Sequence, residues 1–371
     1  MFRPQIQKTN VLVMLSFINI VMVYWALTSF ERFQTFGFDV KINATEIMVD
    51  SINKLRSEFS NKSLNSEDID LFGDFLIGPK RSIIQTTRGS LISKKSTLNP
   101  DFAAMVTEML MELEIDSTSN VAVSMTGSYP GANIAVLSAL EALDVQATVV
   151  SSCGSSEYGA TNPSMTWFDI EAVLYNNNIL KNKTKYGSIG GGLDIGSQLD
   201  IEGLQACEQS MSNNDIVLLS KTFQNNVNGR YSYFIEELKN NELSLFINVG
   251  GGIFSIGDSI NRQSILPGII YPGDISKSRN SSLLEKFSQN NIPVININQI
   301  SLLANWYELP YPPSSKNQYG LGSLFFSTKQ YNPLIIIIAF LISLSSLLLV
   351  GFISHKQIKE RMQSIEPDSI I

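Results

Sequence analysis

The stretch NVAVSMTGSYPGANIAVLSALEALDVQATVVSS, Asn120–Ser152, holds the clearest structural pattern of the chain. Apolar runs of strand length stand at both of its ends, and Ile134, Leu137 and Leu140 recur between them at helical spacing. A strand, a helix and a second strand within about 30 residues form a βαβ unit. Because the two strands of such a unit are usually parallel neighbours, the stretch predicts a parallel sheet.

Helical and strand patterns continue to alternate after this unit. Such alternation predicts an α/β fold, with a mostly parallel sheet and flanking helices in a Rossmann-like three-layer arrangement. We assign it to one domain, residues 81–310. The elements predicted in its second half are helices over 201–211, 230–240, 281–290 and 299–309, and strands over 215–220, 243–249 and 292–298.

Two further patterns precede the βαβ unit. SIIQTTRGSLISKK, Ser82–Lys95, has two short runs typical of strands around Arg88 and Gly89, and it predicts a hairpin. Asn99 and Pro100 stand just before a helical apolar stripe, so a helix should begin at Pro100.

Two uncharged apolar segments, residues 9–30 and 332–354, lie outside this domain. Each can span a bilayer, which needs roughly 20 apolar residues. A cleaved signal peptide is the alternative for the first segment, but its apolar run is long and no clear cleavage site follows. We therefore predict one transmembrane helix at each end of the chain.

The two tails, residues 1–8 and 355–371, carry lysine and arginine near the apolar segments. The positive-inside rule then places both termini in the cytoplasm and residues 31–329 outside the cytoplasmic membrane. Within that segment we expect a juxtamembrane helix and linker over residues 31–80, and a Pro-rich tether over residues 311–331.

Charge and histidine content exclude several functions. The net charge is −7 and the N-terminal tail is positive, so the extracytoplasmic segment is acidic and lacks the basic character that nucleic acid requires. The one histidine, His355, lies in the C-terminal tail. A Ser-His-Asp site or a histidine-ligated zinc site is therefore excluded from the extracytoplasmic segment.

Two glycine runs resemble each other, SIGGGLDIG at 188–196 and NVGGGIFSIG at 248–257. Neither continues as a P-loop or as a dinucleotide motif, so we expect no ATP or NAD site. Three glycines permit a tight turn or a close approach to a ligand. Asp194 is the acidic group of the first run and a candidate catalytic residue.

The two cysteines, Cys153 and Cys207, both lie in the extracytoplasmic segment. An oxidising compartment permits a disulfide, but the sequence alone does not show that two cysteines meet. We expect a free, unreactive pair.

Polar residues follow each predicted strand, in TGSYPGAN, SSCGSSEYGATNPS, SKTFQNN and NVGGG. Ligands of open parallel sheets bind at the carboxyl ends of strands, although turns favour the same residue types without any ligand. Together with basic residues of the expected hairpin, these strand ends give the candidate ligand-binding residues Arg88, Lys95, Gly127, Ser128, Asn133, Ser152, Gly154, Asn162, Asn248, Gly250, Gly251 and Gly252.

Ser128 has three possible roles. Its hydroxyl could cap the helix that begins near Pro130, which is our main expectation. The helix start could instead hold a carboxylate or phosphate on its N–H groups. A catalytic nucleophile would need a base other than histidine, and Lys221 is the candidate if burial lowers its pKa.

Asp169 and Glu171 form the remaining acidic pair, in TNPSMTWFDIEAVL. Trp167 and Ile170 predict a helix whose first turn carries Asp169, and an acidic residue there complements the helix dipole. The functional alternative is a general base or a pair of ligands for a hard cation such as Mg²⁺. We assign no metal site and leave the cofactor open.

Taken together, several motifs resemble the poly-γ-glutamate system protein family, a membrane component encoded with bacterial poly-γ-glutamate synthesis genes. They are GSYPGANIAVLSALEAL, SSCGSSEYGATNPSMTWFDIEAVL, IGGGLDIG and FINVGGGIFSIG, and TTRGSLISKKSTLNPDFAAMV fits the preceding segment. The resemblance covers roughly residues 80–310. Tyr129 stands where phenylalanine is common, and Cys153 stands in a loop that usually lacks cysteine.

The resemblance implies a role in making or exporting an envelope or capsule polymer, but it supplies no catalytic residues. We expect an accessory protein that binds the polymer, a precursor or partner membrane proteins of synthesis and export. The basic residues Arg88, Lys94 and Lys95, with Lys221, could meet its carboxylates. A hydrolase or transferase acting on γ-glutamyl amide bonds and a purely structural subunit are the alternatives.

Overall fold

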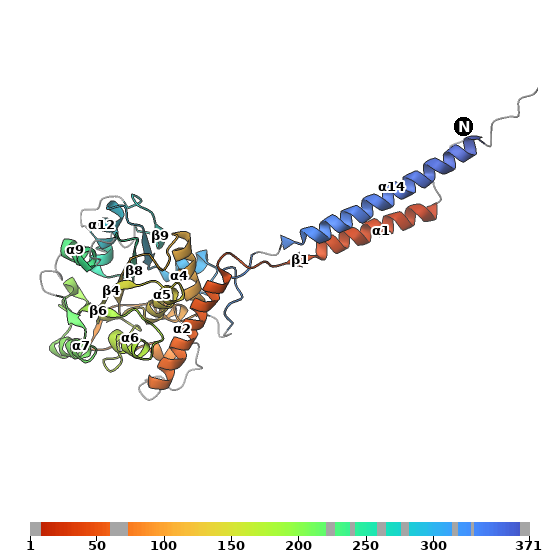
Figure 1. Cartoon of the computed structure of the whole chain (residues 1–371). Coiled ribbons are helices and arrows are strands. Elements are labelled where there is room, and N and C mark those ends of the chain that lie inside the picture. The colour runs from red at the N-terminus through yellow and green to blue at the C-terminus, as the bar shows by residue number, and fades with distance from the viewer. Residues whose placement is uncertain are drawn as a thin grey trace, which may run out of the picture. The chain divides into compact units, whose positions relative to one another are not determined.

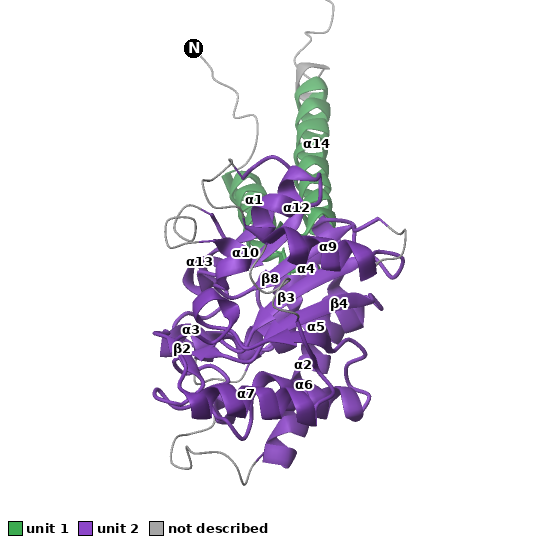
Figure 2. Ribbon diagram, turned by 90° about the vertical axis from the view of Figure 1, so that its left-hand side faces the viewer, with its two compact units in different colours: residues 1–34, 326–371 green, residues 35–325 purple. Residues whose placement is uncertain are grey.

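The computed structural model describes residues 9–59, 73–219, 227–237, 242–257, 265–275, 282–313, 318–327 and 330–363. The chain divides into two compact units (Figure 2). The first unit comprises Met1–Gln34 with Phe326–Ile371, and the second is Thr35–Phe325.

The first unit contains the first and the last described helix of the chain. Helix α1 (Thr9–Thr28) and helix α14 (Pro333–Gln363) lie side by side (Figure 1). Next to them, strand β1 (Phe30–Glu31) pairs antiparallel with strand β11 (Gln330–Tyr331).

Helices α1 and α14 are long and apolar enough to cross a membrane, over the 20 residues Thr9–Thr28 and the 28 residues Pro333–Glu360. The structure describes α1 throughout and buries none of its residues. Exposed apolar surface of this extent is rare on soluble monomers and marks a site of membrane or protein interaction. The two helices therefore indicate membrane association.

The second unit is an α/β domain around a seven-stranded sheet of order β7-β6-β4-β3-β8-β10-β9. Neighbouring strands are parallel except β9, which runs antiparallel to β10. The strands are β3 (Val121–Thr126), β4 (Ala147–Ser152), β6 (Thr184–Ser188), β7 (Val217–Leu218), β8 (Leu245–Val249), β9 (Gly268–Ile270) and β10 (Val294–Ile297).

Helices flank both faces of this sheet, α9 and α12 on one side and α2, α5 and α6 on the other (Figure 1). A small second sheet pairs β2 (Gln85–Thr87) in parallel with β5 (Ser155–Ser156). The helices are α2 (Phe38–Phe59), α3 (Leu91–Ser96), α4 (Asp101–Glu112), α5 (Pro130–Ala142), α6 (Trp167–Asn176), α7 (Ile201–Asn213), α9 (Val227–Glu237), α10 (Ile253–Ile256), α12 (Leu283–Gln289) and α13 (Ile300–Trp306), with short 3-10 turns η1 (Asp74–Leu76) and η2 (Gly192–Asp194).

The core on one face joins Phe246 of β8 and Val294 of β10 to Phe234 of α9 and Phe287 of α12. The rings of Phe246 and Phe287 stack with their centroids 4.2 Å apart. Successive strand residues point to opposite faces, and β8 is buried at every position from Leu245 to Val249. The apolar side chains of the central strands therefore pack against helices on both faces of the sheet.

The predicted α/β fold with a mostly parallel sheet is confirmed, and β3 and β4 are parallel neighbours as expected. The predicted hairpin over Ser82–Lys95 is wrong, because β2 pairs with β5 and α3 replaces the second strand. The Ser90 hydroxyl accepts the N–H of Ser93 at 3.3 Å and caps that helix. The helix expected to begin at Pro100 begins at Asp101.

Cys153 and Cys207 form a disulfide, with their Cα atoms 5.7 Å apart, so the expectation of a free pair is wrong. Cys153 directly follows β4, and Cys207 lies in α7, 54 residues later in the chain. The sequence did not reveal this contact because it depends on how α7 packs onto the sheet.

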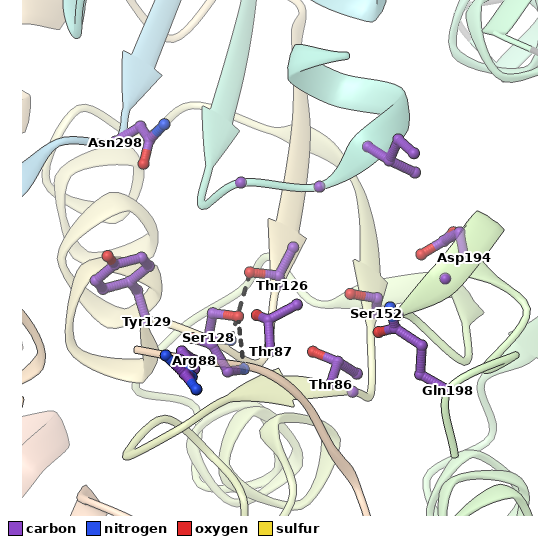
Figure 3. Close-up of a pocket in the computed structure, with 17 residues that line it drawn as sticks. Thr86, Thr87, Arg88, Thr126, Ser128, Tyr129, Ser152, Asp194, Gln198 and Asn298 are labelled. Carbon is purple, nitrogen blue, oxygen red and sulfur yellow. Dashed lines mark hydrogen bonds between the residues drawn. The ribbon is translucent and has the colours of Figure 1, made fainter. Parts of the chain in front are cut away.

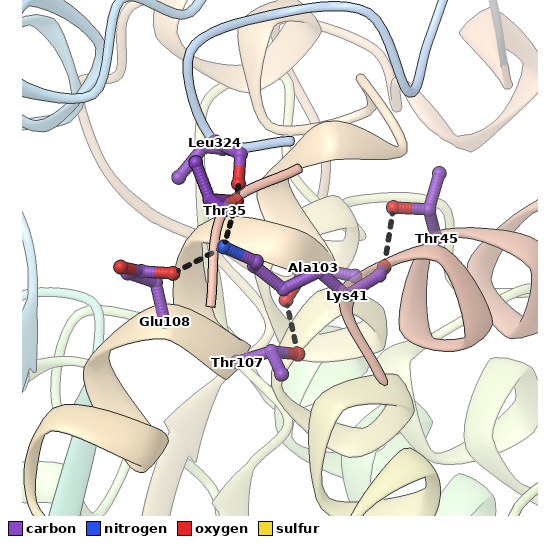
Figure 4. Close-up of polar contacts among 7 residues, drawn as sticks. All are labelled: Thr35, Lys41, Thr45, Ala103, Thr107, Glu108 and Leu324. Carbon is purple, nitrogen blue, oxygen red and sulfur yellow. Dashed lines mark hydrogen bonds and ion pairs between the residues drawn. The ribbon is translucent and has the colours of Figure 1, made fainter. Parts of the chain in front are cut away.

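Lys41 contacts the segment by which the chain enters the second unit, and this segment is bonded to the one by which the chain leaves it (Figure 4). Its ammonium group lies 2.7 Å from both Thr35 Oγ1 and Glu108 Oε2, and its side chain is fully buried. Thr35 in turn donates its hydroxyl to Leu324 O at 2.5 Å and its N–H to Phe325 O at 2.9 Å. One buried cation therefore ties the entry segment, and through it the exit segment, to α4.

Candidate functional site

A cavity of about 280 Å³ opens at the carboxyl ends of the central strands (Figure 3). The chain passes from β3 outward through β4, β6 and β7, and then returns to β8 on the other side of β3. The strand order therefore reverses beside β3. Ligands of open α/β sheets bind at the carboxyl ends of the strands next to such a reversal. The cavity is lined by Thr86, Thr87, Arg88, Thr126, Ser128, Tyr129, Ser152, Gly154, Ser156, Gly191, Gly192, Asp194, Gln198, Gly251, Gly252, Ile253 and Asn298.

Glycines let the strand ends approach one another around this cavity. A Cβ atom on Gly127 would lie 2.7 Å from the carbonyl oxygen of Cys153. Gly250 has a φ of +96°, and a Cβ atom there would lie 2.4 Å from Thr126 Oγ1. Both positions therefore require glycine, which explains part of the glycine-rich sequence without a ligand.

Lys94 of α3 is buried behind the cavity wall, with 1% of its surface exposed. Its ammonium nitrogen donates to the carbonyl oxygen of Ser128 and lies 2.7 Å from Ser156 Oγ. It also lies 3.5 Å from the centre of the Tyr129 ring. All three neighbours line the cavity, so this buried amine adjoins the site directly.

Burial lowers the pKa of Lys94 from its ordinary value of 10.5 to about 7. Desolvation disfavours the charged ammonium, and a carboxylate beside it would oppose that effect. Among the described residues, the ion pairs of the structure involve neither Lys94 nor Arg88. The amine can therefore exist in either protonation state near neutral pH.

Ser128 does not cap the helix, contrary to expectation. Helix α5 has Tyr129 at its N-cap position, without a side-chain hydrogen bond. The Ser128 hydroxyl instead accepts the backbone N–H of Ser156 at 3.0 Å, while its own N–H donates to Thr126 Oγ1 at 3.3 Å (Figure 3). Ser128 thus connects β3 with β5 at the cavity wall.

All three acidic candidate residues have ion-pair or hydrogen-bond partners within the protein. Asp194 lies at the cavity wall and forms a buried ion pair with Arg230 of α9. Asp169 accepts the N–H and the hydroxyl of Thr166 at 2.8 Å, completing a capping box at the start of α6. The expected first-turn role of Asp169 is thereby confirmed.

Glu171 lies at the amino ends of the strands, whereas the cavity lies at their carboxyl ends. Its carboxylate accepts the N–H of Thr184, the first residue of β6, at 2.9 Å, and the Thr184 hydroxyl at 3.0 Å. Burial raises the pKa of Glu171 from 4.5 to about 7. The structure therefore does not bring Asp169 or Glu171 into contact with the cavity residues.

The candidate ligand-binding residues divide into two sets. Arg88, Ser128, Ser152, Gly154, Gly251 and Gly252 line the cavity. The others do not: Lys95 pairs with Asp74, Asn133 donates to Thr126 O, Asn162 accepts the N–H of Ser164, Asn248 donates to Gly250 O and Asn296, and Gly127 and Gly250 shape the strand ends.

Lys221 lies outside the described residues, so its pairing with Ser128 stays a prediction. Sequence reasoning missed Thr86, Thr87, Tyr129 and Ser156 as cavity residues. It grouped Lys94 with Arg88 and Lys95 as basic residues of the expected hairpin. No pattern in LISKKS indicated that one of two adjacent lysines would be buried.

Within the described residues, no group of three or more His, Cys, Asp or Glu side chains could hold a metal ion. Among the described residues, the charged groups that line the cavity are Arg88 and Asp194, and Arg230 neutralises the second. The cavity therefore presents hydroxyls, glycine backbone and positive charge, which suits a carboxylate-bearing ligand. Comparisons with family models, with curated proteins and with solved structures found no match to the chain.

Proposed function

We propose that the protein is a membrane-anchored accessory protein of poly-γ-glutamate biosynthesis or export in a bacterial cell envelope. Its extracytoplasmic domain, of Rossmann-like three-layer type, binds a carboxylate-bearing segment of the polymer or its precursor. Helices α1 and α14 span the cytoplasmic membrane, with both termini in the cytoplasm. Partner proteins of synthesis or export meet it at this membrane.

The observation that carries this proposal is the charge of the cavity. The guanidinium of Arg88 lines it and the amine of Lys94 adjoins it, whereas Asp194, the one carboxylate among the described lining residues, is already paired with Arg230. A guanidinium can bind a carboxylate through two parallel hydrogen bonds. A chain that carries a carboxylate on each residue supplies such groups repeatedly.

Binding of γ-linked glutamate oligomers by the full-length protein in detergent tests the proposal. A hydrogen bond to a charged group contributes about 1.5–3 kcal/mol, so Arg88→Gln should weaken binding by roughly 10- to 100-fold. Arg81→Gln, which changes an exposed arginine of the same segment, is the matched control. Equal affinities of the wild type and Arg88→Gln would overturn the proposed site.

A further inference from the structure

Ser156 and Lys94 form a hydroxyl–amine pair beside the cavity. Lys94 Nζ lies 2.7 Å from Ser156 Oγ, within the reach required for proton transfer. Ser156 lines the cavity with 7% of its surface exposed, whereas Lys94 is almost completely enclosed. A ligand in the cavity can therefore reach the hydroxyl, while bulk water has little access to the amine.

The backbone holds Ser156 in place on three sides. Its N–H donates to Ser128 Oγ at 3.0 Å, and its carbonyl oxygen accepts the N–H of Gly159 at 3.0 Å. Strand β5, which contains Ser156, pairs with Thr87 of β2, another cavity residue. These contacts therefore hold the backbone of Ser156 in position beside the cavity.

The surroundings of Lys94 permit both a neutral amine and the ammonium that forms when it takes up a proton. The carbonyl oxygen of Ser128 accepts one N–H of the amine. Once the amine is neutral, its lone pair can accept the hydroxyl proton of Ser156. The ring of Tyr129 stabilises the ammonium that results, as a cation–π partner. The pKa of Lys94, lowered to about 7 by burial, lies in the range that suits a general base.

We propose that Ser156 is the nucleophile and Lys94 the general base of an acyl-transfer site that hydrolyses amide bonds of a γ-linked glutamyl chain. The γ-glutamyl identity of the chain rests on the proposed function, whereas the role of the pair does not. The site thus deepens that function, because a hydrolase at the envelope can set the length of the polymer.

The reaction follows from the positions of these groups. Ser156 Oγ attacks the amide carbonyl carbon, and the hydroxyl proton passes to Lys94 Nζ. The resulting ammonium protonates the leaving nitrogen as the C–N bond breaks, which leaves an ester on Ser156 and a neutral Lys94. Water then attacks the ester carbon and gives a proton to Lys94. The C–O bond to Ser156 breaks, and Lys94 returns the proton to Ser156 Oγ.

Labelling of the full-length protein in detergent with a fluorophosphonate tests the pair without a polymer substrate. The phosphonyl group should attach to Ser156, as mapped by peptide mass spectrometry. Ser156→Ala should abolish the label, and Lys94→Met should slow it at least 100-fold. Ser57→Ala and Lys54→Met, on exposed or half-buried positions of α2, are matched controls that should label at the wild-type rate.

The pH profile of the wild type gives a second readout that does not depend on a variant folding. The labelling rate should rise through about pH 7 as Lys94 loses its proton. Within the described part of the chain, the other charged or titratable side chains that line the cavity are Arg88 and Tyr129 on this side and Asp194 at its far wall. Burial and the neighbouring Tyr311 raise the pKa of Tyr129 to about 12, so Tyr129 does not titrate in this range.

Lack of label on Ser156, or a wild-type rate in Lys94→Met, would overturn the proposed pair. The two proposals can fail separately. Label on Ser156 without oligomer binding would reject the polymer as ligand but support the catalytic pair. Oligomer binding without label would support the polymer as ligand but reject the catalytic pair.

Discussion

Asp194 and Arg230 form a buried ion pair at the wall of the cavity, between η2 and α9. The guanidinium of Arg230 also lies 4.7 Å from the centre of the Phe254 ring. The pair neutralises the carboxylate in the cavity lining and leaves Arg88 as the remaining full charge among the lining residues that the structure describes. It therefore sets the sign of the charge that a ligand meets.

Removing one partner of this pair should destabilise the protein. Arg230→Met leaves the Asp194 carboxylate buried without its cation, a change that typically lowers the free energy of unfolding by about 3–5 kcal/mol. Denaturant unfolding of the detergent-solubilised protein measures this loss. The double variant Arg230→Met/Asp194→Leu should recover much of it. If the double variant is less stable than Arg230→Met, the pair does not account for the loss.

The disulfide between Cys153 and Cys207 should be present in protein isolated from its membrane. Alkylation of the denatured chain should modify neither cysteine before reduction and both after it. Cys153→Ser/Cys207→Ser should lower the free energy of unfolding by about 2–5 kcal/mol, because the unfolded chain has more conformational freedom without the crosslink. Two reactive thiols without reductant would contradict the pairing and count against the proposed extracytoplasmic location of the domain.

Glu171 should make stability depend on pH. Its folded pKa of about 7 lies above its ordinary value of 4.5, so the folded protein retains a proton that the unfolded chain releases. Stability from this group is complete below about pH 4.5 and is lost as the pH rises to about 7. Glu171→Gln keeps acceptor and donor atoms beside Thr184 and removes the titration.

Denaturant unfolding at pH 5 and at pH 8 measures this effect. Relative to the wild type, Glu171→Gln should gain up to about 3 kcal/mol between the two pH values. Glu202→Gln, at an exposed position of α7, should show no such gain. A pH-independent difference between Glu171→Gln and the wild type would show that Glu171 does not titrate in this range.

Lys41 should control the junction at which the chain enters the second unit. Lys41→Met removes the hydrogen bond to Thr35 and the ion pair with Glu108. The N–H of Thr35, bonded to Phe325 O, should exchange with deuterium at least 10-fold faster. The amides of β3 should keep their protection because that strand lies in the centre of the sheet. Exchange as slow as in Lys54→Met would contradict this role.

The sequence predicted the parts of the fold that depend on local pattern. The apolar runs of β3, β4, β8 and β10 and the helices between them follow directly from periodicity. Strand β6 was missed because TKYGS has no apolar run, and its buried residues include Gly187 and Ser188. The second strand of the expected hairpin failed because Ser90 starts a helix there.

The sequence predicted the location of the candidate site better than it predicted the residues that form it. The rule for parallel sheets located it at the carboxyl ends of the strands, where Ser128 and Ser152 indeed lie. The pairing of Lys94 with Ser156 joins positions 62 residues apart. It depends on the packing of α3 against α5 and of β5 against β2, which local pattern does not specify.

Photo-crosslinking with a γ-linked glutamate oligomer that carries a diazirine tests the proposed ligand site most directly. The full-length protein in detergent should yield adducts within Thr86–Arg88 and Thr126–Tyr129, the two segments that line the cavity on the side of Lys94. Unlabelled oligomer should compete these adducts away. Adducts confined to α2 or α7, or spread evenly over the second unit, would contradict binding in the cavity.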